Sequence, residues 1–258
     1  CNRLSEITNI QLNSQLPYVG KSAFAHKAGM HIDAVIKNPL AYEHIAPETV
    51  GNERVFLMSE VAGRSMIIEK IQKFDSSITK DSPVVSNIVK EVKEKEHQGY
   101  QFEGADGSFE LLVRKAIGKY QSFFKLHYYK TSGEIPLVEK GLYAFAQLKI
   151  DVDGHIQIAA GEGNGPVNAL DNALRSALKP FYPSVEQIHL TDYKVRVLDS
   201  KSATASKVRV LIESSDGTDS WATMGVSCDV VEASWLALVD SFEYKLIKDI
   251  EKKYQKLI

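Results

Sequence analysis

The feature that most constrains the fold of this chain is an internal repeat of 64 residues in its second half. Small and apolar residues recur at that spacing: Gly161 with Gly225, Val167 with Val231, Ala169 with Ala233, Ala173 with Ala237, and Leu174 with Leu238. Two repeated units that each have one apolar face can bury those faces against each other. The seam between such units is a natural place for a small-molecule pocket. We therefore expect a pseudo-twofold domain.

The first unit of the repeat has the pattern of two strands followed by a helix. Residues 142–152 and 155–161 alternate between apolar and polar around Asp153-Gly154, which is a strong hairpin signal. A helix is expected next, beginning near Pro166. Its apolar face comprises Val167, Leu170, Leu174 and Leu178. The expected fold class is α+β, with sheets that are backed by helices.

The second unit shows the same order. Residues 206–214 and 220–227 are predicted strands around the turn Asp216-Gly217, and a long helix is expected from about Val230. A further strand is predicted over residues 188–199, between the two units. We expect the two ββα units to form one domain.

Before the repeat, the pattern is mainly helical. A helix is predicted after Ser82-Pro83 that stops before Gly99, and another from Ser108 to Gly118. Residues 123–130 read as a strand, and TSGEIP, which follows it, as a turn. The sequence thus predicts three parts: residues 1–66, a mainly helical part over 67–139, and the repeat domain over 140–258. The opening residues from Cys1 read as the tail of an earlier element, so we expect a fragment of a longer polypeptide.

Composition excludes several classes of protein. With 44% hydrophobic and 25% charged residues, the 258-residue chain has the composition of a soluble globular protein. A net charge of −2 gives no general attraction to nucleic acid or to an anionic membrane, and no apolar run is long enough to span one. The two cysteines, Cys1 and Cys228, make a disulfide framework improbable. A cytoplasmic protein is expected.

The stretch AFAHKAGMHIDAV, residues 23–35, concentrates polar side chains around a glycine. A helical zinc pair needs histidines four residues apart, whereas His26 and His31 are five apart, and Gly29 disfavours a helix. We therefore expect no metal here and a structural role for His26 in a loop. His31 could be oriented by Asp33 and could form a proton-transfer pair with Tyr42.

The segment GEGNGP, residues 161–166, links a strand to a helix. It lacks the third-glycine spacing of a dinucleotide fingerprint and the lysine of a P-loop. Its glycines suit close approach of the backbone to a helix or to a small ligand, and the N–H groups at the helix start could hold a carboxylate. An amino-acid effector is therefore expected at Gly161, Gly163, Asn164, Gly165, Pro166 and Val167, and at Gly225 and Val231 of the second unit.

Residues 17–65, PYVGKSAFAHKAGMHIDAVIKNPLAYEHIAPETVGNERVFLMSEVAGRS, resemble the segment that follows the catalytic barrel in 2-isopropylmalate, homocitrate and citramalate synthases. GNGPVNALDNALRSAL, TDYKVRVLDS and EASWLALVDSFEYKL resemble the C-terminal regulatory domain of this family. The details are most similar to the citramalate synthase branch. The resemblance covers nearly the whole chain, but not the TIM barrel.

The resemblance implies an enzyme that condenses acetyl-CoA with a 2-oxo acid, here pyruvate, as a homodimer. His31 and Tyr42 would assist proton transfer in the barrel of the partner subunit. A divalent metal would be bound by the absent barrel, so no cofactor is expected in this chain. The regulatory domain would bind isoleucine or leucine as a feedback inhibitor.

Three further expectations follow from the missing barrel. The chain alone is expected to have no synthase activity. A 2-isopropylmalate synthase fragment is an alternative, since the choice of 2-oxo acid lies in the barrel. The rival from another class is a module that senses branched-chain amino acids and oligomerises without a catalytic contribution.

Overall fold

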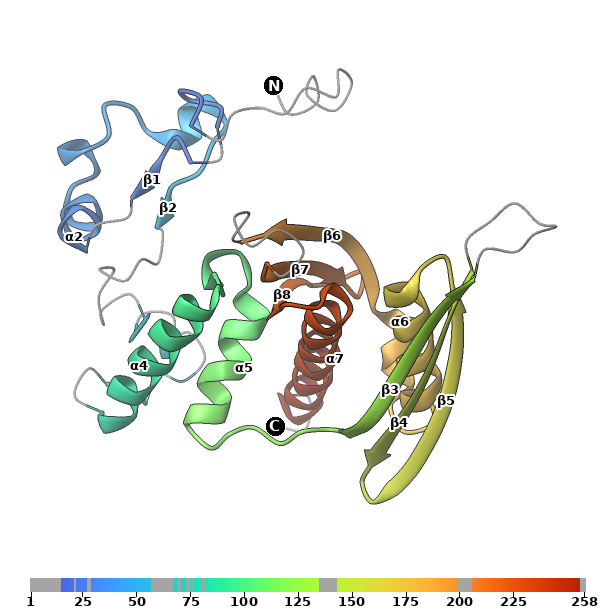
Figure 1. Cartoon of the computed structure of the whole chain (residues 1–258). Helices are drawn as coiled ribbons and strands as arrows, with labels where there is room; N and C mark the ends of the chain where they lie inside the picture. The colour runs from blue at the N-terminus through green and yellow to red at the C-terminus, as the bar shows by residue number, and fades with distance from the viewer. Residues whose placement is uncertain are drawn as a thin grey trace. The chain divides into compact units, whose positions relative to one another are not determined.

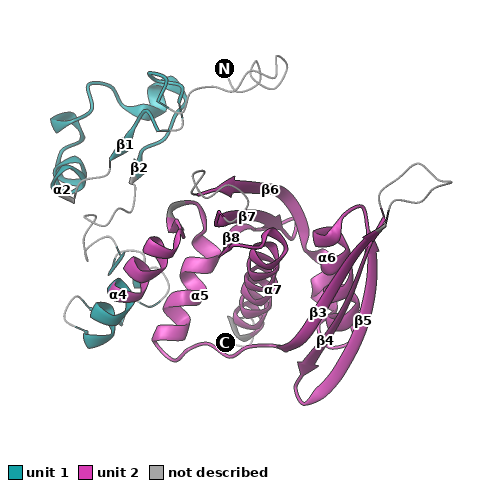
Figure 2. Ribbon diagram, in the orientation of Figure 1, with its two compact units in different colours: residues 1–89 teal, residues 90–258 magenta. Residues whose placement is uncertain are grey.

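The computed structural model describes residues 15–20, 22–26, 29–56, 67–68, 71–72, 75, 77–79, 82–134, 143–198 and 206–255. They form two compact units, residues 1–89 and 90–258 (Figure 2). The fold is α+β, and the described residues contain no barrel. The boundaries expected at residues 66 and 139 remain predictions.

The first unit is small. It contains a two-residue parallel pair of strands, β1 (Ala25–His26) and β2 (Val55–Phe56). Helix α2 (Gly29–Lys37) and two 3-10 turns, η1 (Pro39–Ala41) and η2 (Pro47–Val50), lie between them in sequence. Ile32 and Val35 form the buried face of α2.

The second unit begins within α4 (Pro83–Gln98) and continues through the 3-10 turn η3 (Phe102–Gly104) and α5 (Asp106–Ala116). Helix α4 starts at Pro83 and ends before Gly99, as predicted. Helix α5 begins two residues earlier than predicted, because Asp106 provides a favourable negative charge in the first turn.

The repeat domain consists of two three-stranded antiparallel sheets and two helices. The first sheet contains β3 (Lys125–Glu134), β4 (Tyr143–Val152) and β5 (His155–Gly163), followed by α6 (Pro166–Leu178) and η4 (Pro183–Gln187). The second contains β6 (His189–Val197), β7 (Val208–Ser215) and β8 (Ser220–Ser227), followed by α7 (Val230–Gln255). The pseudo-twofold repeat is confirmed, and each unit is one strand longer than the predicted ββα.

The additional strands obey the same 64-residue spacing. A register shift interrupts β3 between Leu126 and Tyr128, and another interrupts β6 between Leu190 and Asp192. The predicted turn after residue 130 was wrong in its first part, since β3 continues to Glu134, which pairs with Tyr143 of β4. Pairing with a neighbouring strand here overrides the weak turn signal of Ser132-Gly133.

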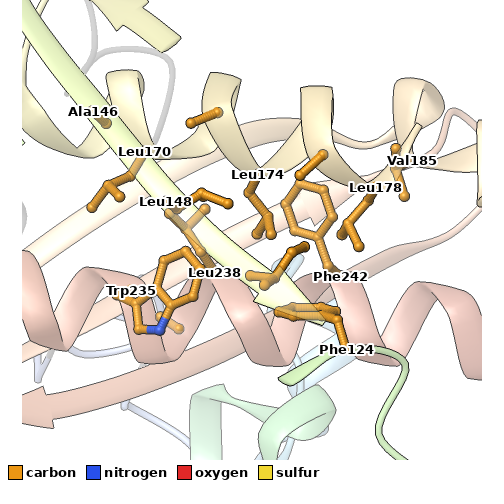
Figure 3. Packing of buried hydrophobic residues seen from close by; sticks show 14 of the residues in the cluster. Phe124, Ala146, Leu148, Leu170, Leu174, Leu178, Val185, Trp235, Leu238 and Phe242 are labelled. Atoms are coloured by element: carbon orange, nitrogen blue, oxygen red, sulfur yellow. The ribbon is translucent and has the colours of Figure 1, made fainter. Parts of the chain in front are cut away.

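Helices α6 and α7 pack between the two sheets, α6 against β4 and β5 and α7 against β7 and β8 (Figure 1). The leucines of α6 and the large side chains of α7 approach each other in one continuous core (Figure 3). Fully buried members of this core are Leu148, Leu170, Leu174, Leu178, Leu238 and Phe242. Burial of each such side chain contributes about 1.5–3 kcal/mol.

Two glycines set the distance between each sheet and its helix. A Cβ atom on Gly161 would lie 2.5 Å from the carbonyl oxygen of Ala169, and one on Gly225 would lie 2.0 Å from that of Ala233. These contacts involve backbone atoms of α6 and α7, which cannot move aside cheaply. The recurrence of glycine at these two positions is therefore explained by close strand-to-helix packing.

Candidate functional sites

The structure brings the predicted proton-transfer pair together. His31 lies on α2, and Tyr42 follows the 3-10 turn η1, which Asn38 caps by accepting a hydrogen bond from the N–H of Leu40. The two rings contact each other in a tilted arrangement, with their centroids 4.4 Å apart and their planes at 35°. Both side chains are exposed, Tyr42 to 51%. A phenol and an imidazole are thus presented side by side on the surface of the first unit.

Two local expectations about this stretch were wrong. Gly29 does not interrupt a helix but begins α2, because the first helical position has no preceding turn that a glycine would weaken. Asp33 does not orient His31. Its carboxylate accepts a hydrogen bond of 2.7 Å from Lys37, one turn further along the helix. Residues two apart on a helix do not face each other, whereas residues four apart do.

Glu43, the residue after Tyr42, anchors this segment. Its side chain is 3% exposed, and it accepts hydrogen bonds from Arg54 Nε at 2.7 Å and Nη2 at 2.6 Å. His26 Nε2 lies 2.8 Å from the same carboxylate. The hydrogen bonds from Arg54 lower the pKa of Glu43 below its usual value, against the effect of burial, and the contact with His26 lowers it further. His26 thus has the expected structural role, but on strand β1 rather than in a loop. Glu43 and Arg54 could not be anticipated from the sequence, because the stretches YEH and NER carry no distinguishing pattern.

A cavity of about 310 Å³ adjoins this segment, with Tyr42 and Glu43 in its wall. Tyr18 and His44 line it as well, and Tyr18 Oη lies 3.2 Å from His44 Nε2. Tyr18 has a positive φ of 65°, which is uncommon for a residue with a side chain. The amide of Asn52 supports this conformation by donating to the carbonyl oxygen of Tyr18.

The predicted effector residues of the first repeat surround the start of α6. Cβ atoms on Gly161 and Gly163 would each lie 2.5 Å from backbone atoms of α6, so both residues face the helix. The N–H of Asn164 donates to the Asn168 side chain at 3.1 Å. Gly165 is the N-cap residue, Pro166 is the first helical residue, and no side chain caps the helix. The N–H groups at the start of α6 therefore lack a capping partner among the described side chains.

Val167, the last of these residues, lines a cavity of about 500 Å³ beside α6, which we call the α6 cavity. Its other lining residues are Asn168, Asp171, Arg175, Glu186, Ile188, His189, Leu190 and Tyr193. These residues could not be anticipated from the sequence, because they come from α6, η4 and β6 and converge only in the folded chain.

The α6 cavity contains an unsatisfied carboxylate oxygen. Asp171 is 9% exposed, and its Oδ2 accepts a hydrogen bond of 2.9 Å from Arg175 Nε. Its Oδ1 is buried and has no hydrogen-bond partner in the described part of the chain. Arg175 is held in turn by the carbonyl oxygen of Val185, at 2.8 Å. A buried carboxylate oxygen without a partner is costly and suits a cationic ligand group.

The predicted residues of the second repeat have different surroundings. Gly225 packs against Ala233 of α7, and Val231 lies against the core of the repeat domain. The N–H of Val231 donates to the Asp229 carboxylate at 2.6 Å, and Glu232 N–H donates to the same oxygen. The start of α7 is thus capped, and of the predicted effector residues only Val167 lines the α6 cavity. Their assignment to an effector stays a prediction.

The described residues contain neither a cluster of metal ligands nor a helix that could span a membrane. No group of three or more histidine, cysteine, aspartate or glutamate side chains among them could hold a metal ion. None of the helices they form is long and apolar enough to cross a membrane.

Two protein families match the chain. Residues 103–246 match the family described as the LeuA allosteric (dimerisation) domain, and residues 18–99 match the one described as homocitrate synthase post-HMGL domain-like. The first match contains both repeats apart from the end of α7. The second contains the His31–Tyr42 pair and the whole of α4.

Individual relatives match over nearly the whole chain. An (R)-citramalate synthase of Geobacter sulfurreducens is 47% identical over 246 residues, which cover 95% of this chain and 47% of that protein. One of Aquifex aeolicus is 44% identical over 257 residues, or 97% and 48%. A probable 2-isopropylmalate synthase of Methanopyrus kandleri is 30% identical over 243 residues, or 92% and 46%. The chain spans about half the length of these relatives.

Proposed function

This chain belongs to the LeuA allosteric (dimerisation) domain family, and on that premise we propose that it is part of an acetyl-CoA-dependent acyltransferase of the citramalate synthase type. The observation that carries this proposal is the 47% identity to an (R)-citramalate synthase, against 30% to a probable 2-isopropylmalate synthase. The reaction proposed for the whole enzyme joins acetyl-CoA to pyruvate. The divalent metal of the barrel and a cytoplasmic location are part of the same proposal.

The catalytic contribution proposed for this chain comes from His31 and Tyr42, acting in the barrel of a partner subunit. Their neighbouring rings present an imidazole and a phenol together, and both groups can carry a proton. Their exposure fits a role toward another polypeptide. The anchored Glu43 keeps the segment that bears Tyr42 close to β1 through His26 and Arg54.

A hybrid enzyme tests this contribution, with this chain joined to the other half of the Geobacter synthase. Thiol release from acetyl-CoA and pyruvate should fall about 100-fold or more in His31→Ala and at least about 10-fold in Tyr42→Phe. His155→Ala, an exposed histidine in the β4–β5 hairpin, is the control and should retain full turnover. Unchanged turnover in His31→Ala would favour the rival, a sensing module without a catalytic contribution. This chain alone should release no thiol.

The regulatory contribution proposed is the binding of a branched-chain amino acid, isoleucine or leucine, in the α6 cavity. Val167, Ile188 and Leu190 supply apolar surface for an aliphatic side chain. The uncapped N–H groups at the start of α6 suit the ligand carboxylate, and Asp171 Oδ1 suits its ammonium. These three features match the three parts of the ligand.

Calorimetric titration of isoleucine, leucine and valine into the chain tests this site. We expect heat with at least one of them, and an affinity at least about 10-fold weaker in Asp171→Asn, because a charged hydrogen-bond partner is lost. Asp33→Asn, an exposed aspartate of the first unit, is the matched control. An absence of heat with all three amino acids would leave only an interaction role.

Dimer formation is proposed through β6. Tyr193, Val195 and Val197 pair with Ile212, Val210 and Val208 of β7 and so point to the same face of the sheet as these residues. Val210 and Ile212 are buried against the helices, whereas Val195 is 46% exposed. The other described residues leave this core-facing row of side chains uncovered, which fits burial by a second copy. This agrees with the dimerisation domain named by the matching family.

A further inference from the structure

The side chain of Tyr42 has few contacts of its own. Its ring meets that of His31, and it is exposed and lines the cavity of about 310 Å³. Within the described part of the chain, its hydroxyl group has no hydrogen-bond partner. Its backbone is fixed on one side, because its N–H donates to the carbonyl oxygen of Pro39 in η1 at 3.2 Å. On the other side, the phenol depends on the residues that follow, Glu43 and His44.

Glu43 and His44 are each held by the side chain of a distant residue. Arg54 donates to both carboxylate oxygens of Glu43, from Nε to Oε1 at 2.7 Å and from Nη2 to Oε2 at 2.6 Å. The Glu43 side chain is 3% exposed and that of Arg54 is 24% exposed, so water competes little for this pair. His44 Nε2 lies 3.2 Å from the hydroxyl oxygen of Tyr18. A bidentate pair fixes orientation as well as distance, so the contact of Glu43 with Arg54 is the firmer of the two.

Both contacts lead back to one segment, residues 52–54, directly before β2. Arg54 belongs to it, and Asn52 donates from Nδ2 to the carbonyl oxygen of Tyr18 at 2.9 Å. Tyr18 has a φ of 65°, a backbone conformation that a residue with a side chain keeps only when its surroundings hold it there. Asn52 therefore fixes the position from which the Tyr18 ring reaches His44.

This segment is itself fixed by backbone hydrogen bonds at both ends. The N–H of Asn52 donates to the carbonyl oxygen of Pro47 at 3.0 Å, and that of Val55 donates to the carbonyl oxygen of Phe24 at 3.1 Å. The N–H of Glu53 donates to the Asn52 side chain at 2.8 Å, whereas the Glu53 side chain is exposed. The side chains that the segment directs toward Glu43 and Tyr18 thus start from a rigid backbone.

We propose that Asn52 and Arg54 are positioning residues, which hold the phenol of Tyr42 against His31. Each acts through a neighbour of Tyr42 in the chain and not on its ring. The consequence for turnover rests on the function proposed above, whereas the geometry does not. A proton-transfer group that is displaced by about 1 Å loses rate while substrate binding elsewhere is unaffected. The expected signature is a lower kcat at an unchanged KM.

The geometry can be tested in the chain alone by NMR of its seven histidines. The signal of His31 is the one that His31→Ala removes, and the ring current of Tyr42, 4.4 Å away, displaces it. Tyr42→Ala gives its position without that ring. Arg54→Gln, and to a smaller extent Asn52→Ala, should move the His31 signal toward this position. Glu53→Gln, in the same segment, is the control and should leave the signal in place.

Two measurements keep this test decisive if a variant is unstable. Methyl signals of Ile32 and Val35, which are buried on α2, report whether the first unit is folded. Arg54→Lys retains one charged hydrogen bond to Glu43 and should place the His31 signal between those of the unchanged chain and of Arg54→Gln. A His31 signal that does not move in either folded variant of Arg54 would overturn the proposal.

Turnover of the hybrid enzyme separates this inference from the proposed function. Arg54→Gln should lower kcat about 10-fold and Arg54→Lys less, with KM for pyruvate and acetyl-CoA within about twofold. Glu53→Gln should retain full turnover. Glu43→Gln combined with Arg54→Gln should be no worse than the more severe single change, because both break the same pair.

The two proposals fail in different ways. If His31→Ala lowers kcat but a folded Arg54→Gln does not, the positioning role fails and the catalytic proposal stands. If Arg54→Gln moves the His31 signal while neither it nor His31→Ala changes kcat, Arg54 positions the pair and the catalytic proposal fails. A rise in KM at unchanged kcat in Arg54→Gln would contradict the positioning role, since it would indicate a contact that serves substrate binding.

Discussion

Where the first repeat has Gly165, Asp171 and Arg175, the second has Asp229, Trp235 and Val239 at the equivalent positions. The backbone plan is shared, down to the register shifts in β3 and β6. The side-chain chemistry of the two repeats differs, because no side chain caps the start of α6, whereas Asp229 caps the start of α7. The difference shows how a duplicated unit can keep its packing and diverge at the few positions that face a cavity.

Gly161 and Gly225 test the packing that the two repeats share, and their substitution should have the largest effect on stability. Gly161→Ala and Gly225→Ala each place a Cβ atom within 2.5 Å of helix backbone. Each should lower the free energy of unfolding by roughly 2–3 kcal/mol, with Gly225→Ala the worse, because the helix must move outward. The measurement is chemical denaturation. Gly133→Ala, whose Cβ would meet nothing closer than 4.0 Å, should be neutral, and equal stability of all three variants would break the comparison.

The first strands test whether only one repeat forms the dimer surface. Val195→Lys on β6 should weaken self-association at least about 10-fold, or roughly 1.4 kcal/mol, because it places a charge in a buried interface. Thr131→Lys is the equivalent change 64 residues earlier, on β3, and should have little effect. Sedimentation equilibrium measures both. A stronger effect of Thr131→Lys would assign the interface to the other repeat.

Asp240 tests the difference in side-chain chemistry between the two repeats, because the equivalent residue of the first repeat is the uncharged Ser176. Burial raises the pKa of Asp240 to about 6, so its ionised form destabilises the fold above pH 6 and does so less as pH falls toward the unfolded value of about 4. Asp240→Asn should therefore raise the free energy of unfolding at pH 7.5 by about 1 kcal/mol. The gain should vanish near pH 4. Denaturation of both proteins across this pH range is the measurement, and a gain that does not depend on pH would contradict the account.

Charged groups on three helices face Asp240, and their charges bear on its pKa. Lys95 and Glu91 lie on α4, Lys115 on α5 and Glu243 on α7. The lysines lower the pKa of Asp240 and Glu243 raises it. The increase in the pKa of Asp240 that burial produces is larger than the decrease that the lysines produce, so desolvation sets the direction of the prediction.

Much of the repeat domain followed from the sequence, because its signals are local or periodic. The Asp-Gly hairpins, the apolar face of α6 and the 64-residue spacing of Gly161 and Gly225 each predicted what the structure contains. The first strand of each repeat, β3 or β6, was predicted as a strand but not as part of the unit. Its membership depends on pairing between segments, which no local pattern records.

The candidate sites were only partly predictable for the same reason. The proximity of His31 and Tyr42 was anticipated from their residue types, whereas the Glu43–Arg54 pair depends on the parallel pairing of β1 with β2. Asp171 gave no sequence signal, since its unpaired oxygen becomes evident only when β6 passes α6. A site whose residues come from several elements cannot be predicted from the periodicity and spacing of the sequence.

The most direct test of the central claim, an effector site in the α6 cavity, is amide hydrogen exchange with and without isoleucine. The account predicts slower exchange at the start of α6 and along residues 188–193, where the cavity wall lies. Helix α2 of the first unit should be unchanged and serves as the internal control. Unaltered exchange at both α6 and residues 188–193 under saturating isoleucine would contradict the account.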